Sequence, residues 1–255
     1  MKKFFALLLA IVMVMACSAA MADRLGDIMT AGKIVVATSP DWPPYEYYDD
    51  QNNVVGTDVL MVKWMAEQLG VELEIKEMNF DACLTAVQMG DVDMVVAGLT
   101  YDEDRLSAME LTGIYWNEGD QGLLVKKGEG ASYNTAEAFN GKVVAAQNAT
   151  NQAIMVEEQL TGAELKPVTT IPDGVTMLMS GRVDALAVPK TVYDSILAEN
   201  DQVEVADFAF DFEGGNYIAS VKGEDALTAK IQELIDQINA EGLYQQWVDE
   251  ILLNK

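Results

Sequence analysis

The residues best suited to hold a small molecule lie in one stretch, Ala97-Gly98-Leu99-Thr100-Tyr101-Asp102-Glu103-Asp104-Arg105. Gly98 allows a ligand to approach the backbone closely, and Thr100 offers a hydroxyl group and a backbone amide. Arg105 carries a planar guanidinium that can bind a carboxylate through two parallel hydrogen bonds. This chemistry favours holding a carboxylate over breaking bonds. From this stretch alone, the alternative of a turn with a solvated arginine stays open.

The elements around this stretch indicate how it is positioned. The apolar run Met94-Val95-Val96 predicts a short buried strand that ends at the polar residues. Further strands are predicted over 33–38, 71–75, 121–128, 142–146, 165–168, 183–188, 203–205 and 217–221. Helical spacing predicts helices over 58–69, 81–89, 151–160, 174–180, 191–197, 227–238 and 243–251, the first two capped by Asp58 and Asp81. Strands that alternate with helices indicate the α/β class with largely parallel sheets.

An internal echo indicates two lobes of the same build. Gly90-Asp91-Val92-Asp93-Met94-Val95-Val96 is matched by Gly181-Arg182-Val183-Asp184-Ala185-Leu186-Ala187. Each run ends a helix and begins a buried strand. In open α/β sheets, ligands bind beyond the carboxyl ends of the strands. If the lobes face each other, we expect residues 97–105, 147–152 and 189 to line one cleft.

A loop dense in aromatic residues follows the first predicted strand. It reads Ser39-Pro40-Asp41-Trp42-Pro43-Pro44-Tyr45-Glu46-Tyr47, and its prolines stiffen the backbone. We expect Trp42 to wall the ligand pocket. The alternative is that these rings plug the end of the sheet, and for Tyr45 both interpretations remain open.

The first residues predict export. Met1-Lys2-Lys3, an apolar run over 4–15 and the small-residue site Ala20-Met21-Ala22 form a signal peptide over residues 1–22. Lipoprotein processing at Cys17 ranks second. We therefore expect a periplasmic protein in which Cys83 is the one remaining cysteine, buried in the core and without a disulfide.

The composition excludes several classes of function. The chain has 16 basic and 41 acidic residues, a net charge of −25. Such a surface repels nucleic acid and anionic lipid. The absence of histidine removes Ser-His-Asp catalysis and most zinc sites. We predict no nucleic-acid partner, no metal and no cofactor.

With these residues in view, the chain resembles the bacterial extracellular solute-binding proteins of family 3, the amino-acid-type periplasmic receptors of ABC importers. The resemblance rests on residues 97–100 with Arg105, on Gly-x-Val-Asp-Ala at 181–185, and on 217–222 leading to the final helices. It implies a two-lobed type II periplasmic-binding-protein fold with two hinge strands. Lobe 1 would comprise residues 23–125 and 217–255, and lobe 2 residues 126–216. We expect a monomer.

The resemblance also implies a site. Arg105 would bind the ligand carboxylate beside Ala97, Gly98 and Thr100. Thr150 and Asn151 would offer backbone amides at a helix N-terminus, and Trp42 and Phe80 would enclose the ligand side chain.

One position departs from the pattern, because Pro189 stands where relatives place an acid that binds the ligand ammonium. Two explanations remain open. The ligand lacks a primary α-ammonium, or a carboxylate from elsewhere replaces the lost one, with Asp194, Asp211 and Glu118 as the candidates.

The predicted function is delivery of a small carboxylate, an amino acid or a derivative, to the membrane permease of an ABC importer, without enzyme activity. The alternative is an enzyme on the same scaffold, such as a dehydratase of a small cyclic acid. Without histidine, that enzyme would need a base such as Glu118 or Lys190.

Overall fold

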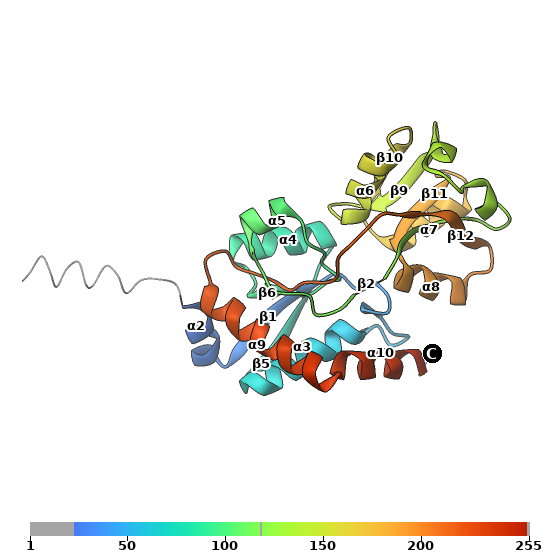
Figure 1. Ribbon diagram of the computed structural model, residues 1–255. Helices are drawn as coiled ribbons and strands as arrows, with labels where there is room; N and C mark the ends of the chain where they lie inside the picture. The colour runs from blue at the N-terminus through green and yellow to red at the C-terminus, as the bar shows by residue number, and fades with distance from the viewer. Residues whose placement is uncertain (1–22, 118, 254–255) are drawn as a thin grey trace, which may run out of the picture.

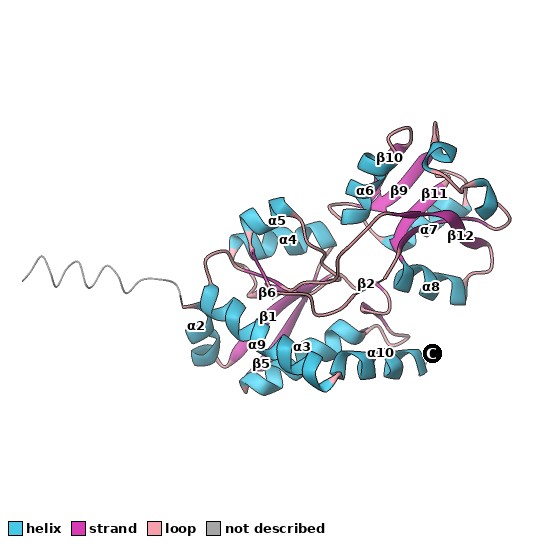
Figure 2. Ribbon diagram, viewed as in Figure 1, coloured by secondary structure: helices cyan, strands magenta, loops and turns pink. Residues whose placement is uncertain are grey.

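Residues 23–117 and 119–253 are described by the computed structural model, and they form two α/β lobes (Figures 1 and 2). The predicted signal peptide lies outside the described residues. Within the described ranges, no helix is long and apolar enough to cross a membrane.

The first lobe is built on a five-stranded sheet with the order β5-β1-β6-β13-β7. Its strands are β1 (Lys33–Thr38), β5 (Glu72–Glu77), β6 (Met94–Val95), β7 (Glu110–Leu111) and β13 (Ala219–Ser220). β1 pairs in parallel with β5 and β6, whereas β13 runs antiparallel to β6 and β7. The sheet is therefore mixed, and the expectation of a largely parallel sheet holds only for its β5-β1-β6 half.

Helices cover both faces of this sheet, which explains why β1 is apolar along most of its length. Ile34 and Val36 pack in a core cluster with side chains of α3 and α9, and Ala37 packs with Cys83 and Val87 of α4. The helices of this lobe are α2 (Arg24–Ala31), α3 (Thr57–Leu69), α4 (Phe80–Met89), α5 (Glu103–Ala108), α9 (Asp225–Glu241) and α10 (Leu243–Leu253).

The second lobe holds a sheet with the order β10-β9-β11-β8-β12. Its strands are β8 (Gln121–Lys126), β9 (Val143–Gln147), β10 (Glu164–Val168), β11 (Ala185–Pro189) and β12 (Val203–Phe210). β9 pairs in parallel with β10 and β11, and β8 is antiparallel to β11 and β12. Its helices are α6 (Asn151–Gln159), α7 (Ile171–Met179) and α8 (Lys190–Glu199), with short 3-10 turns η1 (Gly130–Ser132) and η2 (Ala136–Phe139).

Two connections cross between the lobes, one between β7 and β8 and one between β12 and β13 (Figure 1). They are hydrogen-bonded to each other, because the Tyr115 amide donates to the Asn216 carbonyl at 2.9 Å and the Asn216 amide donates to the Trp116 carbonyl at 2.7 Å. The predicted boundary at residue 125 is wrong in detail. β8 lies in the second sheet, so the first crossing precedes Gln121. A further small sheet, β2 (Asp41–Trp42), β3 (Glu46–Tyr48) and β4 (Val54–Val55), carries the aromatic loop.

The two echoed sequences occupy equivalent places. The carboxylate of Asp93 accepts a hydrogen bond from the Val35 amide of β1 at 2.6 Å, and that of Asp184 accepts one from the Val143 amide of β9 at 2.9 Å. Each aspartate thus satisfies a backbone donor at the start of a strand beside its own. The repeated sequence therefore corresponds to the same helix–turn–strand arrangement in both lobes.

Two predicted helix caps are wrong. α3 begins at Thr57, so Asp58 lies inside the helix, where it is 1% exposed. α4 begins at Phe80 after Asn79, so Asp81 is in its first turn. Asp58 is buried because Tyr244 and Tyr115, both distant in sequence, donate to its carboxylate at 2.6 Å and 2.7 Å.

Candidate functional site

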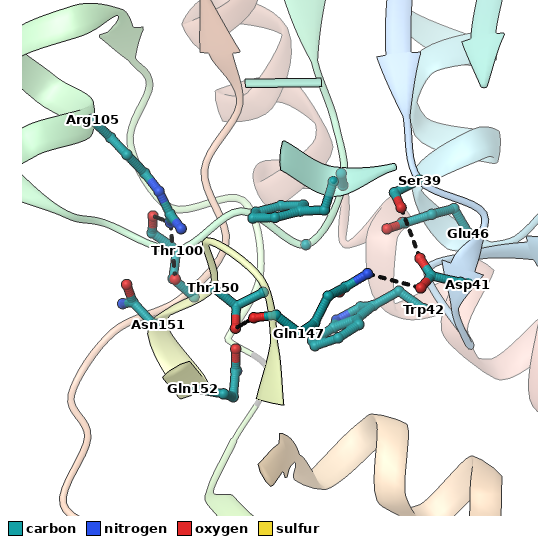
Figure 3. Close-up of a pocket in the computed structure, with 13 residues that line it drawn as sticks. Ser39, Asp41, Trp42, Glu46, Thr100, Arg105, Gln147, Thr150, Asn151 and Gln152 are labelled. Carbon is teal, nitrogen blue, oxygen red and sulfur yellow. Dashed lines mark hydrogen bonds between the residues drawn. The ribbon is translucent and has the colours of Figure 1, made fainter. Parts of the chain in front are cut away.

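A pocket with an empty volume of about 280 Å³, counting its opening to solvent, lies where the two lobes meet (Figure 3). Two of the three segments expected in one cleft are brought together here. The predicted residues that line it are Trp42, Phe80, Ala97, Gly98, Thr100, Arg105, Thr150 and Asn151. Gln147 and Gln152 also line it and belong to the expected segment 147–152, whereas Ser39, Asp41 and Glu46 were not predicted.

Arg105 is held rigidly at the first-lobe side of the pocket. The Asp102 side chain caps α5 by accepting from the amides of Asp104 and Arg105 at 2.9 and 3.1 Å. The guanidinium is buried. Its Nη1 donates to the Thr100 carbonyl at 2.5 Å and its Nη2 to the Ala149 carbonyl of the second lobe at 2.6 Å. Burial lowers the pKa of Arg105 to about 10, against the opposing effect of Asp102, so the group stays charged at neutral pH.

This charge has no anionic partner within the described residues, since no carboxylate there lies within ion-pair distance of Arg105. A buried cation without a counter-ion is costly. Arginine carries five N–H donors in a fixed fork, and an anion entering the pocket would supply the missing charge.

The second lobe contributes the start of α6. Thr150 caps this helix, with its Oγ1 accepting from the Ala153 amide and donating to the Gln147 carbonyl at 2.7 Å. Asn151 reaches the first lobe, where its Nδ2 donates to the Tyr101 carbonyl at 3.0 Å. A helix N-terminus beside Arg105 adds partial positive charge to the same part of the pocket.

Trp42 and Phe80 form two apolar walls, and each is 5% exposed. Phe80 lies against Arg105, whose guanidinium carbon is 5.6 Å from the ring centre. Trp42 packs directly on Gly98, where an added Cβ would meet the indole ring at 3.0 Å. Gly98 also has a φ of +56°, so a side chain at this position is disfavoured by both backbone and space.

Asp41 joins the lobes at the opposite side from Arg105. Its Oδ1 accepts from the Ser39 hydroxyl at 2.8 Å. Its Oδ2 accepts from Nε2 of Gln147 at 2.8 Å and from the amide of Ile171, the first residue of α7, at 3.0 Å. Burial raises the pKa of Asp41, and these hydrogen bonds oppose the rise. The carboxylate therefore ties the β2 loop to the second lobe.

Glu46 is fully buried, and neither carboxyl oxygen has a hydrogen-bond partner among the described residues. Burial, together with the nearby Asp58 and Asp41, raises its pKa well above the usual range. The pocket thus holds a cation at one end and two acidic side chains at the other (Figure 3).

Pro189 is not among the lining residues of this pocket, and its place in the cleft stays a prediction. It ends β11 and is buried in the second sheet. The proposed substitutes do not line the pocket either. Asp194 forms a surface ion pair with Lys190 at 2.6 Å, Asp211 is exposed, and Glu118 lies outside the described residues. The candidate base Lys190 does not line the pocket either.

Two lobes joined by two crossings, with a charged pocket where they meet, define the class of two-lobed solute receptors. The chain belongs to the bacterial extracellular solute-binding proteins, family 3, whose model matches residues 34–253. This confirms the resemblance and the fold expected from the sequence.

Relatives share most of the chain length. The arginine-binding extracellular protein ArtP of Bacillus subtilis is 28% identical, covering 97% of this chain and 98% of ArtP. The L-cystine-binding protein TcyJ of Escherichia coli K12 is 25% identical, covering 87% of this chain and 83% of TcyJ. An amino acid ABC transporter substrate-binding protein from Streptococcus pneumoniae, solved with L-arginine bound, superimposes with a TM-score of 0.85 at 32% identity and covers 90% of this chain and 98% of that one.

Proposed function

We propose that this protein is a periplasmic receptor that closes on an α-amino acid with a cationic side chain and delivers it to the permease of an ABC importer. The observation that carries the proposal is the buried Arg105, which has no anionic partner among the described residues. A monomeric receptor that captures its ligand and performs no reaction on it accounts for this pocket.

The ligand carboxylate belongs beside Arg105. The guanidinium fork and the N-terminus of α6 both favour an anion there, and Thr100 brings a hydroxyl group to the same place. Phe80 and Trp42 line the pocket with aromatic side chains, which suit the apolar part of a ligand side chain.

The other end of the pocket favours a positive charge. Glu46 is a buried carboxyl without a hydrogen-bond partner among the described residues, and Asp41 lies beside it. A ligand cation would pair with Glu46 and remove the cost of burying it alone. The ArtP name and the arginine-bound S. pneumoniae structure agree with a basic amino acid.

Calorimetric titration of L-arginine into the protein and into Arg105→Ala tests the proposal. Removing one partner of a buried charge pair costs about 3–5 kcal/mol, which is roughly two to four decades in affinity. We expect Arg105→Ala to lose measurable binding at micromolar ligand. Arg182→Ala, which removes an exposed arginine, should bind as the parent does. Affinity of Arg105→Ala within tenfold of the parent would overturn the assignment of the carboxylate site.

A further inference from the structure

Among the residues that the structure describes, no carboxylate of the second lobe lines the pocket near the end of β11. Pro189 has neither a polar side chain nor a backbone N–H, and it pairs with Gln121 across the antiparallel β8–β11 ladder. Gln121 is fully buried. The side chain that links Gln121 to the pocket is a neutral amide, that of Gln152.

Gln152 lies in the first turn of α6, is 3% exposed and lines the pocket beside Thr150 (Figure 3). Its Nε2 donates to Oε1 of Gln121 at 2.7 Å. This bond fixes the amide plane and commits its donor end to Gln121. No described residue donates to the Oε1 of Gln152, so an acceptor is left at the pocket.

The position of this acceptor suits the α-carbon of a ligand. Arg105 contacts the carbonyl of Ala149, directly before the Thr150 cap, so a carboxylate held by Arg105 lies against the start of α6. The α-carbon of the ligand is bonded to this carboxylate, so the substituent on the α-carbon would lie near the first turn of α6, which carries Gln152.

We propose that Gln152, held by Gln121, accepts the hydrogen bond from the α-substituent of the ligand, so that this receptor binds the α-position through a neutral amide and not through an ion pair. The inference rests on the proposed function, because it takes the carboxylate of the ligand to be held at Arg105.

A specificity follows from the chemistry. A hydrogen bond from an ammonium to a carboxylate is stronger than one to a neutral amide oxygen, and the pocket must still desolvate the ammonium. An α-hydroxyl also donates, and it is cheaper to desolvate. An α-keto group only accepts and would face the amide oxygen with no hydrogen to share. We therefore expect the α-amino and α-hydroxy acids to bind within about tenfold of each other, and the α-keto acid much more weakly.

The experiment compares L-arginine with its α-hydroxy and α-keto analogues by calorimetry, on the wild type, on Gln152→Glu and on Gln152→Leu. Gln152→Glu should shift the preference towards L-arginine by about tenfold or more, and Gln152→Leu should weaken the amino and hydroxy acids together by about tenfold. Gln159→Glu places the same charge on the same helix at a half-buried position that contacts the backbone of Asp211 and does not line the pocket, and it should leave the preference unchanged. Melting of each free variant, followed by circular dichroism, establishes that it folds.

The outcomes separate the two proposals. An unchanged amino-to-hydroxy preference in Gln152→Glu, a wild-type preference for L-arginine above a hundredfold, or tight binding of the keto analogue would overturn the role of Gln152 and leave the proposed function standing. If the wild type bound none of the three acids, the proposed function and this inference would both fall.

Discussion

Glu46 is a carboxyl group that folding buries close to a second buried carboxyl group, that of Asp58, and this arrangement works against stability. Its raised pKa means that the folded protein favours the protonated form. The unfolded chain ionises near the ordinary glutamate value of about 4.3. This group therefore contributes stability below that value, and the contribution is lost as the pH rises towards the raised pKa. The ligand-free receptor is thus destabilised at neutral pH by a residue of its own pocket.

Glu46→Gln should separate stability from binding. Without ligand, we expect a higher melting temperature for the variant than for the parent, with a larger difference at about pH 7 than at about pH 5. The variant should also bind L-arginine more weakly while its affinity for the uncharged analogue L-citrulline changes little, because only the guanidinium cation pairs with a carboxylate. Thermal melting and calorimetry measure both effects.

The exposed glutamate Glu157 supplies the matched control, Glu157→Gln, which should change neither quantity. Equal losses for L-arginine and L-citrulline in Glu46→Gln would contradict the placement of the ligand cation at Glu46.

At the scale of single residues, the sequence predicts the carboxylate side of the pocket better than the other side. Arg105 stands out because arginine is rare here and follows Gly98 and Thr100 at a strand end. Glu46 and Asp41 are two of 41 acidic residues, and nothing local distinguishes a buried carboxylate from a solvated one. Gln152 becomes notable only when its bond to Gln121, far away in the chain, is seen.

Asp41 binds the N-terminus of α7. Thr170 caps this helix, Pro172 lies in its first turn, and the Ile171 amide is directed at the Asp41 carboxylate of the other lobe. A carboxylate at a helix N-terminus is stabilised by the helix dipole as well as by the hydrogen bond. This contact forms only when the lobes are close, so it stabilises the closed form.

Asp41→Asn should therefore weaken closure. We expect the ligand to dissociate faster and the dissociation constant of L-arginine to rise by about tenfold, with little change in the association rate. Stopped-flow tryptophan fluorescence measures both rates. Asp194→Asn, in an exposed pair with Lys190, should leave them unchanged. A slower association with an unchanged dissociation rate would show that Asp41 does not act on the closed form.

Most of the long elements follow from periodicity, but α2 and α5 were not predicted, and the short strands β6 and β13 were found only within longer apolar runs. Strands β1 and β5 and helices α3 and α9 carry enough apolar repeats to be recognised. The two-residue strands β2, β4 and β7 have no period to detect, although they carry the aromatic loop and complete the first sheet. The antiparallel direction of β8 is likewise absent from its apolar pattern, because a strand buried on both faces looks the same in either orientation.

The first lobe as a whole depends on both ends of the chain. β13 lies between β6 and β7, so residues 219–220 supply the only described strand partner that joins β7 to the sheet. The sequence indicated a discontinuous lobe through its resemblance to a family. Periodicity alone could not indicate it, because a strand pattern at residues 217–221 does not show which of the two sheets that segment joins.

The reactivity of Cys83 tests whether the first lobe depends on the C-terminal segment. It is fully buried in a cluster that includes Ala219 of β13, and burial raises the pKa of its thiol to about 12. The thiolate is the reactive form, so the full chain should react with a thiol reagent only as fast as it opens. A chain that ends at Asn216 should react at least about tenfold faster, as a chromogenic disulfide would show. Equal rates for both chains in denaturant serve as the control, and protection in the shortened chain would show that the first lobe folds without its tail.

The position of β13 between two earlier strands also determines the order in which the two sheets can be completed. A polypeptide that crosses a membrane from its N-terminus presents residues 121–210, the whole second sheet, before β13 has arrived. Every strand of the second sheet is then available, whereas β7 still lacks its neighbour β13 in the first sheet. The first lobe therefore begins to emerge before the second lobe but completes its sheet after it. Until β13 arrives, the apolar surfaces of the first lobe stay exposed and prone to aggregation or to binding by chaperones.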